Sequence, residues 1–197
     1  MKYIAAISLI LMLGACREKA GQPQTETTGT AQSVQETGTA TATTTGATGG
    51  TSSALSPDDK EFISKAGMGG LAEVQMGNLA LAKASSADVK AFGQRMVTDH
   101  SKANEELQQL ATAKGVALPT ELDAGHKATM NHLSSLSGAE FDKAYMKDMV
   151  EDHVEDVGEF DKASTSAQDS DLKSWAGKTL PILKEHLQLA KTVARKV

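Results

Sequence analysis

Residues 85–115 read SSADVKAFGQRMVTDHSKANEELQQLATAKG, and their pattern decides the fold. Apolar or small residues and one histidine recur every three or four positions, which places them on one face of an α-helix. These positions are Val89, Phe92, Met96, His100, Ala103, Leu107 and Leu110. Ser85-Ser86 before the stretch and Gly115 after it are signals for a helix start and a helix end. We therefore expect a long helix whose buried face is interrupted by a histidine.

Three further stretches have the same periodicity. The first begins at Ser56-Pro57-Asp58-Asp59, where an N-cap hydroxyl precedes a proline and two acids. Another follows Ser137-Gly138-Ala139-Glu140, which has the sequence of a capping box, and the last begins near Ser170. Residues 116–137 contain Pro119 and a weaker helical stretch. We predict an all-α four-helix bundle with a short extra helical connection between helices two and three.

The two halves of this region echo each other. Phe62 and Glu73 recur as Phe141 and Asp152, and after a short insertion Val89-Lys90 recurs as Leu172-Lys173. We interpret the echo as two related helical hairpins.

The composition excludes several classes of protein. The 197 residues include 20 basic and 25 acidic side chains, for a net charge of −5, so we expect no nucleic-acid partner. A single cysteine excludes an intramolecular disulfide framework and any metal site built from several cysteines. That cysteine therefore needs another explanation.

The first residues resemble an export signal for a lipoprotein. Met1-Lys2-Tyr3 is basic, and the apolar run Ile4–Leu13 is too short to span about 30 Å of hydrocarbon. The run ends in Leu13-Gly14-Ala15-Cys16, which is similar to a bacterial lipobox. This resemblance implies that residues 1–15 are removed as a signal peptide and that Cys16 is lipidated, which anchors the chain to a membrane. Arg17 favours an outer-membrane lipoprotein, with the domain facing the periplasm.

Residues 16–55 follow as a tether. They are rich in Thr, Gly, Ala, Gln and Ser and have few large apolar residues, so they cannot bury enough surface to fold. The folded domain is predicted to cover residues 56–197.

Each long helix carries one polar residue where its apolar face should continue: Glu73, His100, His153 and His186. Counted from the helix ends, all four lie near the middle of the bundle. A buried carboxylate or imidazole needs a partner, and four such groups at one level can satisfy one another. They form either a hydrogen-bonded polar core or the ligand set of a metal ion.

Three imidazoles and a carboxylate suit Zn, Cu or Fe. Asp156 lies one turn after His153 and is a candidate fifth ligand or hydrogen-bond acceptor. Met96 and Met149 each precede a histidine by one turn, and a thioether beside an imidazole suits copper, although both also fit as core residues. Asp99 and Glu185 adjoin histidines on a different face, where we expect supporting or surface contacts.

The order and spacing of several segments resemble the ferritin-like family called domain of unknown function 4142, which is often labelled as an outer-membrane protein and so implies a place in the bacterial envelope. The segments are Glu73-Val74, Gly77-Asn78-Leu79-Ala80, Met96-Val97-x-Asp99-His100, Leu118-Pro119, Met149-Val150-x-Asp152-His153 and Leu180-Pro181-x-Leu183-x-x-His186. The resemblance implies a ferritin-like bundle and no particular reaction. Diiron members of the ferritin-like class use Glu-x-x-His, whereas Val97, Val150 and Leu183 stand at the corresponding positions here.

Three functions are consistent with this pattern. The first is a non-enzymatic, lipid-anchored protein that binds a metal ion or small ligand at the bundle centre, in envelope stress or metal handling. The second is a structural or protein-interaction module with a polar core and no cofactor. The third is a metal-dependent oxidase. The sequence indicates no particular protein partner or oligomeric state.

Overall fold

The computed structural model describes residues 55–197, which form helices and no strands. The helices are α1 (Pro57–Lys83), α2 (Ala87–Ala113), α3 (Ala124–Ser135), α4 (Gly138–Ser166) and α5 (Ser170–Ala194). The predicted all-α bundle with a helical connection is confirmed. The predicted signal peptide, Cys16 and the tether up to residue 54 lie outside the described residues. No helix of residues 55–197 is long and apolar enough to cross a bilayer.

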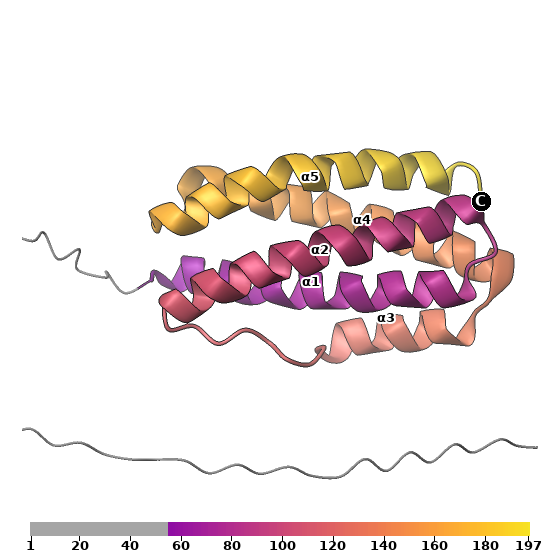
Figure 1. The fold of residues 1–197 in the computed structure, drawn as a ribbon, viewed down its shortest axis with the longest axis horizontal. Coiled ribbons are helices and arrows are strands. Elements are labelled where there is room, and N and C mark those ends of the chain that lie inside the picture. The colour runs from indigo at the N-terminus through magenta and orange to yellow at the C-terminus, as the bar shows by residue number, and fades with distance from the viewer. Residues whose placement is uncertain (1–54) are drawn as a thin grey trace, which may run out of the picture. The chain divides into compact units, whose positions relative to one another are not determined.

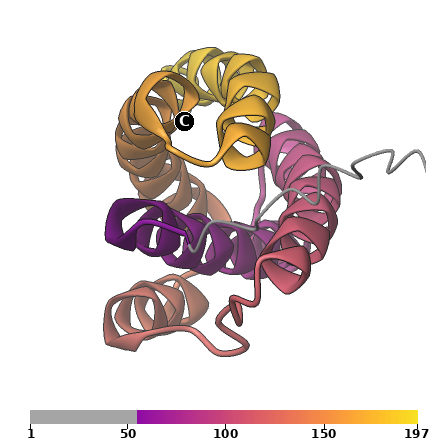
Figure 2. The ribbon, with the colours of Figure 1, turned by 90° about the vertical axis from the view of Figure 1, so that its left-hand side faces the viewer.

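The bundle consists of two antiparallel hairpins, α1 with α2 and α4 with α5 (Figure 1). In the end view, the four long helices surround a common core in the order α1, α2, α5, α4, and α3 lies outside this ring beside α1 (Figure 2). The connection that contains α3 runs back along the bundle, so α2 and α4 point in the same direction (Figure 1). One long crossover of this kind is the topology of ferritin-like bundles.

The helix starts follow the predicted capping signals in part. The Ser56 hydroxyl accepts a hydrogen bond from the Asp59 N–H at 3.0 Å, as predicted for an N-cap. The prediction of a capping box at Ser137 is wrong, because the Ser137 side chain makes no capping hydrogen bond. Its backbone is extended, and Gly138 adopts a positive φ of 61° at the start of α4. Gly138 therefore supplies the turn into α4 that the hydroxyl was expected to stabilise.

Two buried carboxylates join the hairpins reciprocally. Asp59 on α1 accepts hydrogen bonds from the N–H groups of Gln168 and Asp169 in the α4–α5 turn, at 3.2 and 3.0 Å. Asp142 on α4 accepts from the N–H groups of Ser85 and Ser86 in the α1–α2 turn, at 3.1 and 2.9 Å. Each hairpin thus binds the turn of the other.

The hairpins are related by one constant sequence interval. The interval from Asp59 to Asp142 equals the interval between the two turns that these carboxylates bind. The interpretation of two related hairpins agrees with this arrangement. The short insertion expected within the second hairpin, before the segment that begins at Leu172, is wrong, because one interval relates both helices of the two hairpins.

The apolar core is divided by the polar residues into two clusters. One cluster contains Phe92, Tyr145 and Met149, and the other contains Ile63 and Trp175. On α2, α4 and α5, one histidine separates the segment that contributes to the first cluster from the segment that contributes to the second. Leu55, predicted to belong to the tether, is 8% exposed and packs in the second cluster, so the packed domain includes residue 55.

Close contact between α1 and α2 depends on glycine. A Cβ atom at Gly77 would lie 2.8 Å from the Gly93 carbonyl oxygen and 2.9 Å from a methyl group of Val97. The first of these contacts is with backbone, which cannot rotate away. Glycine at residue 77 therefore allows the two helix axes to approach each other at the level just beyond Glu73.

We expect Gly77→Ala to destabilise the domain by about 1–2 kcal/mol, because overpacking at the helix contact exceeds the gain in helix propensity. Gly158→Ala is the matched control, since a Cβ atom there would meet nothing within 4 Å, and it should stabilise the domain by up to about 1 kcal/mol. Urea denaturation followed by circular dichroism measures both effects. Equal effects of the two substitutions would contradict the role assigned to Gly77.

Candidate metal centre

The structure brings the four predicted polar residues together at the middle of the bundle. Glu73, His100, His153 and His186 come from α1, α2, α4 and α5, and their exposed fractions lie between 0 and 5%. The centroids of the three imidazole rings are 5.2, 5.4 and 5.7 Å apart. One potential ligand atom from each ring lies within 4.8 Å of those from the other two.

Each imidazole is held in place by an acceptor on one of its two nitrogens. His100 Nδ1 lies 2.7 Å from Glu73 Oε2, and His186 Nε2 lies 2.8 Å from Asp99 Oδ2. His153 Nδ1 donates to the backbone carbonyl of Met149, one turn earlier on α4, at 2.9 Å. Because carboxylates and carbonyls accept hydrogen bonds, these ring nitrogens carry the proton. The opposite nitrogen of each neutral ring therefore carries a lone pair.

Those opposite nitrogens are buried and have no partner among residues 55–197. The atoms are His100 Nε2, His153 Nε2 and His186 Nδ1, together with Glu73 Oε1. His153 Nε2 lies 3.4 Å from Glu73 Oε1, so two acceptor atoms face each other without a donor between them. A separation of ~3.4 Å is expected for two ligand atoms that each lie ~2.1 Å from one tetrahedral ion. This arrangement can accommodate a cation.

Charges within the cluster keep the carboxylate ionised. Burial alone would raise the pKa of Glu73, but the neighbouring His100, His153 and His186 outweigh burial and leave the pKa below its usual value. Burial likewise opposes protonation of His100, yet the Glu73 carboxylate raises the pKa of His100 above its usual value. Glu73 and His100 therefore favour each other's charged form, and a metal ion that binds His100 Nε2 would displace the proton that this nitrogen carries in the charged form.

The other two imidazoles favour the neutral form. Burial lowers the pKa of His153, and the Glu73 charge only partly compensates. Burial lowers the pKa of His186 to about 4, although its hydrogen bond to Asp99 acts in the opposite direction. Neutral imidazole is the form that binds a metal ion, so two of the three rings need lose no proton on binding.

Asp99 supports His186 from the neighbouring helix. Its Oδ2 atom contacts both His186 Nε2 and Arg95 Nε, the latter at 2.9 Å, and Arg95 also contacts Glu185 at 3.0 Å. Burial alone would raise the pKa of Asp99. The hydrogen bonds from His186 and Arg95 outweigh burial and leave the pKa of Asp99 below its usual value. A carboxylate that orients a ligating imidazole is common at metal sites. The sequence predicted a supporting contact for Asp99 but not which histidine it contacts.

Asp156, Met96 and Met149, the predicted additional ligands, lie near the centre in different environments. Asp156 is half-buried, and its Oδ1 atom is 4.0 Å from the position of a Cβ atom on Gly69 of α1. Burial and the charge of Glu73 raise the pKa of Asp156 well above its usual value, which favours an uncharged carboxyl. Met96 and Met149 are fully buried in the first apolar cluster. Metal ligation by these three residues stays a prediction.

Two groups near the centre were missed by sequence reasoning. Asp152, adjacent to His153, is half-buried, and burial together with the Glu73 charge raises its pKa to about 7. The Tyr145 hydroxyl is buried without a partner among the described residues, and burial raises its pKa. The repeated Asp-His pair at residues 99–100 and 152–153 could have indicated Asp152, whereas Tyr145 reads as an ordinary apolar position.

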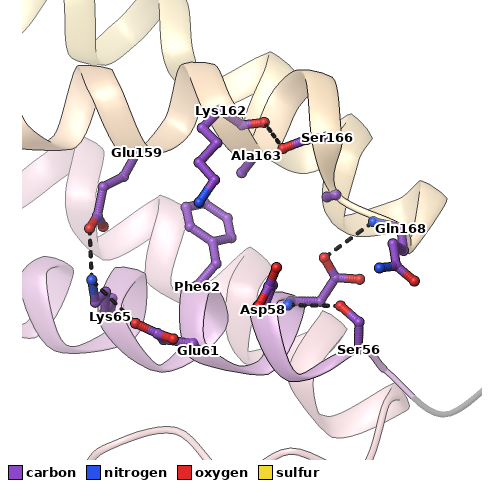
Figure 3. A pocket seen from close by; sticks show the side chains of 12 residues that line it. Ser56, Asp58, Glu61, Phe62, Lys65, Glu159, Lys162, Ala163, Ser166 and Gln168 are labelled. Carbon is purple, nitrogen blue, oxygen red and sulfur yellow. Dashed lines mark hydrogen bonds and ion pairs between the residues drawn. The ribbon is translucent and has the colours of Figure 1, made fainter.

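A cavity of about 280 Å³ lies away from the histidines, between the start of α1 and the end of α4 (Figure 3). Phe62 lines it, and Lys65 at its edge contacts Glu159 at 3.0 Å and Glu61 at 3.5 Å. Its remaining labelled polar groups include Ser56 and Gln168, which take part in the capping contacts of Asp59 (Figure 3). This cavity is therefore bordered by groups that hold the end of the bundle together.

The fold and the polar centre define a ferritin-like helical bundle with a histidine-rich core. The chain belongs to the family described as a domain of unknown function, DUF4142, whose model matches residues 43–193. No curated protein matches the chain.

Two solved structures are similar in fold. The first, a DUF305 fragment from Deinococcus radiodurans, has a TM-score of 0.65 and 10% identity and covers 74% of this chain and 100% of its own. The second, CopM in the Cu(II)-bound form, has a TM-score of 0.60 and 15% identity, with 70% and 96% covered. At these identities, the likeness shows a shared fold.

We expect the free energy of unfolding of the metal-free native protein to fall more than that of the His186→Gln variant as the pH falls from about 6.5 to about 4. The pKa of His186 is about 4 in the folded protein against an ordinary value of 6.5, so the unfolded chain takes up this proton first. The contribution of neutral His186 is present above pH ~6.5 and is lost as the pH falls, by up to about 3 kcal/mol.

Urea denaturation of both chains at several pH values measures this effect, because titrations common to both chains cancel in the difference. A difference that does not change with pH would contradict the lowered pKa of His186.

Proposed function

We propose that this chain is a lipid-anchored protein of the bacterial envelope that binds one divalent transition-metal ion at the bundle centre. The ion is held by His100, His153 and His186, with Glu73 as a carboxylate ligand. Cys16 carries the anchor, and the domain works on the periplasmic side of the outer membrane in metal handling. No catalytic step is part of this proposal.

The supporting observation is the pair of acceptors formed by His153 Nε2 and Glu73 Oε1, 3.4 Å apart. A polar core that served only structure would pair its buried groups, because each unpaired one costs about 1–3 kcal/mol. Here four atoms of one cluster have no partner within the described part of the chain, and three of them are ring nitrogens. A metal ion bound by the three imidazoles, whose ligand atoms lie within 4.8 Å of one another, would satisfy these nitrogens, and Glu73 Oε1 lies 3.4 Å from one of them. A metal ion therefore accounts for the geometry better than a structural polar core.

Copper is the first metal to test. Sites built from imidazole bind Cu(II) more tightly than Zn(II) or Fe(II) in the usual order of affinities. A protein of the same fold, CopM, was solved in a Cu(II)-bound form. Met96 and Met149 would suit Cu(I) if they turned toward the ion. Zn(II) and Fe(II) are the alternatives, since both accept three nitrogen ligands and one oxygen ligand.

An oxidase of the diiron type is disfavoured by the same geometry. Such a centre takes Glu-x-x-His from two helices, so that carboxylates join the two ions. Glu73 is the one fully buried carboxylate within contact distance of the described imidazoles, and its Oε2 atom is engaged by His100. The ligand set therefore suits a single ion.

We expect the full chain, purified without a histidine tag, to retain about one equivalent of Cu(II) after removal of loosely bound metal. His153→Ala should weaken binding by at least about 100-fold, since changes outside the ligand set already cost 10–100-fold. Mass spectrometry of the bound metal and competition with a chelator measure stoichiometry and affinity.

His132→Ala is the matched control, because His132 is exposed on α3, outside the cluster, and it should leave copper binding unchanged. Retention of less than about 0.1 equivalents of Cu(II), Zn(II) and Fe(II) would overturn the proposal. Equal effects of His153→Ala and His132→Ala would overturn the assigned site.

We expect Cys16→Ser to move the protein from the membrane fraction to the soluble fraction of the cell envelope, because the lipid chains supply the anchor. Labelling with a radioactive fatty acid should be lost in the same variant. Ala20→Ser, four residues later, is the control and should keep both properties. A Cys16→Ser chain that stays membrane-bound and labelled would contradict lipidation at this cysteine.

A further inference from the structure

A second cavity, of about 270 Å³, opens between α2 and α5 and reaches the candidate metal centre. His100 and His186 both line it, whereas Glu73 and His153 do not. The cavity therefore meets the ligand cluster from the side opposite α1 and α4. Its volume far exceeds that of one water molecule, about 30 Å³, and approaches the lower limit for small-molecule sites.

The two imidazoles that line this cavity each have a ring nitrogen without a partner in the described part of the chain. His100 Nε2 and His186 Nδ1 are buried and have no hydrogen-bond partner within residues 55–197. An ion bound to these nitrogens would be held by two side chains that line the cavity. Three imidazoles and one carboxylate oxygen leave Cu(II) able to take a further ligand, because this ion adopts tetragonal geometries.

The charges that line the cavity favour an anion. Lys102 on α2 and Lys178 on α5 both line it, and neither forms a salt bridge with any residue from 55 to 197. Two carboxylates also line it, but Asp99 is paired with Arg95 and His186, which leaves Glu106 as the one opposing free charge. With a divalent ion below, the balance is positive.

We propose that the cavity between α2 and α5 binds a small monoanion, a carboxylate or an inorganic anion of a few atoms, as an exchangeable ligand of the bound metal. Lys102 and Lys178 attract the anion, and His100 and His186 hold the ion that it contacts. Ala103 and Ile182 add apolar surface beside the anion and so admit a short carboxylate. This inference rests on the proposed metal site and adds the class of molecule that reaches it.

The test uses azide, a small monoanion whose binding to Cu(II) gives a charge-transfer absorption band. The full chain is loaded with one equivalent of Cu(II) and titrated with azide. We expect a saturable band, and we expect acetate to compete for the same site. The double variant Lys102→Gln/Lys178→Gln should weaken azide binding about fivefold. Each lysine is exposed to solvent, so its attraction for the anion changes the affinity by less than about tenfold. Copper stoichiometry should not change in this variant.

Lys90→Gln/Lys173→Gln is the matched control, with one exposed lysine on each of the same helices and neither in the cavity, and it should bind azide like the native chain. Copper that is retained without an azide band would overturn this inference and leave the metal proposal intact. Equal azide affinities in the two double variants would overturn the assignment to this cavity. A chain that retains no copper would overturn both proposals together.

Discussion

The buried pair of Glu73 and His100 places one carboxylate between the two hairpins of the bundle. One carboxylate oxygen contacts His100 on α2 at 2.7 Å, and the other lies 3.4 Å from His153 on α4. A carboxylate that is 1% exposed stays ionised only if positive or proton-donating groups surround it. The three imidazoles supply this environment for Glu73. The contact of α1 with α2 at Gly77 and Gly93 keeps Glu73 within reach of His100.

The centre departs from the symmetry that the rest of the fold follows. Asp59 and Asp142 bind the two turns in the same way. By the same sequence interval, the position equivalent to Glu73 in the second hairpin is Asp156, and the position equivalent to His100 is Leu183. Leu183 cannot bind a metal ion, and Asp156 is half-buried with a raised pKa. Two related hairpins therefore give one ligand set instead of two.

Periodicity was sufficient to predict the helices and the level of the polar residues, because both depend on distances along a helix axis. It was not sufficient for contacts that depend on which helices are neighbours. Asp99 contacts His186 because α2 packs beside α5, and the sequence has no signal for that adjacency. The unpartnered nitrogens depend on ring rotation about the side-chain bonds, which spacing along the chain does not specify. The expected cap at Ser137 failed because Gly138 takes a positive φ, a local alternative with the same sequence.

The polar layer has an energetic consequence for the metal-free protein. Replacing buried ionic groups by apolar residues of similar size is often neutral or stabilising, so the layer is not needed to hold such a bundle together. Its unpartnered acceptors carry a desolvation cost that a cation would offset, and metal binding would then contribute directly to folding stability. Because the ion would link α1, α2, α4 and α5, that stabilisation would act on both hairpins at once. The two apolar clusters could form without the ion, whereas the layer between them would be completed only when the ion binds.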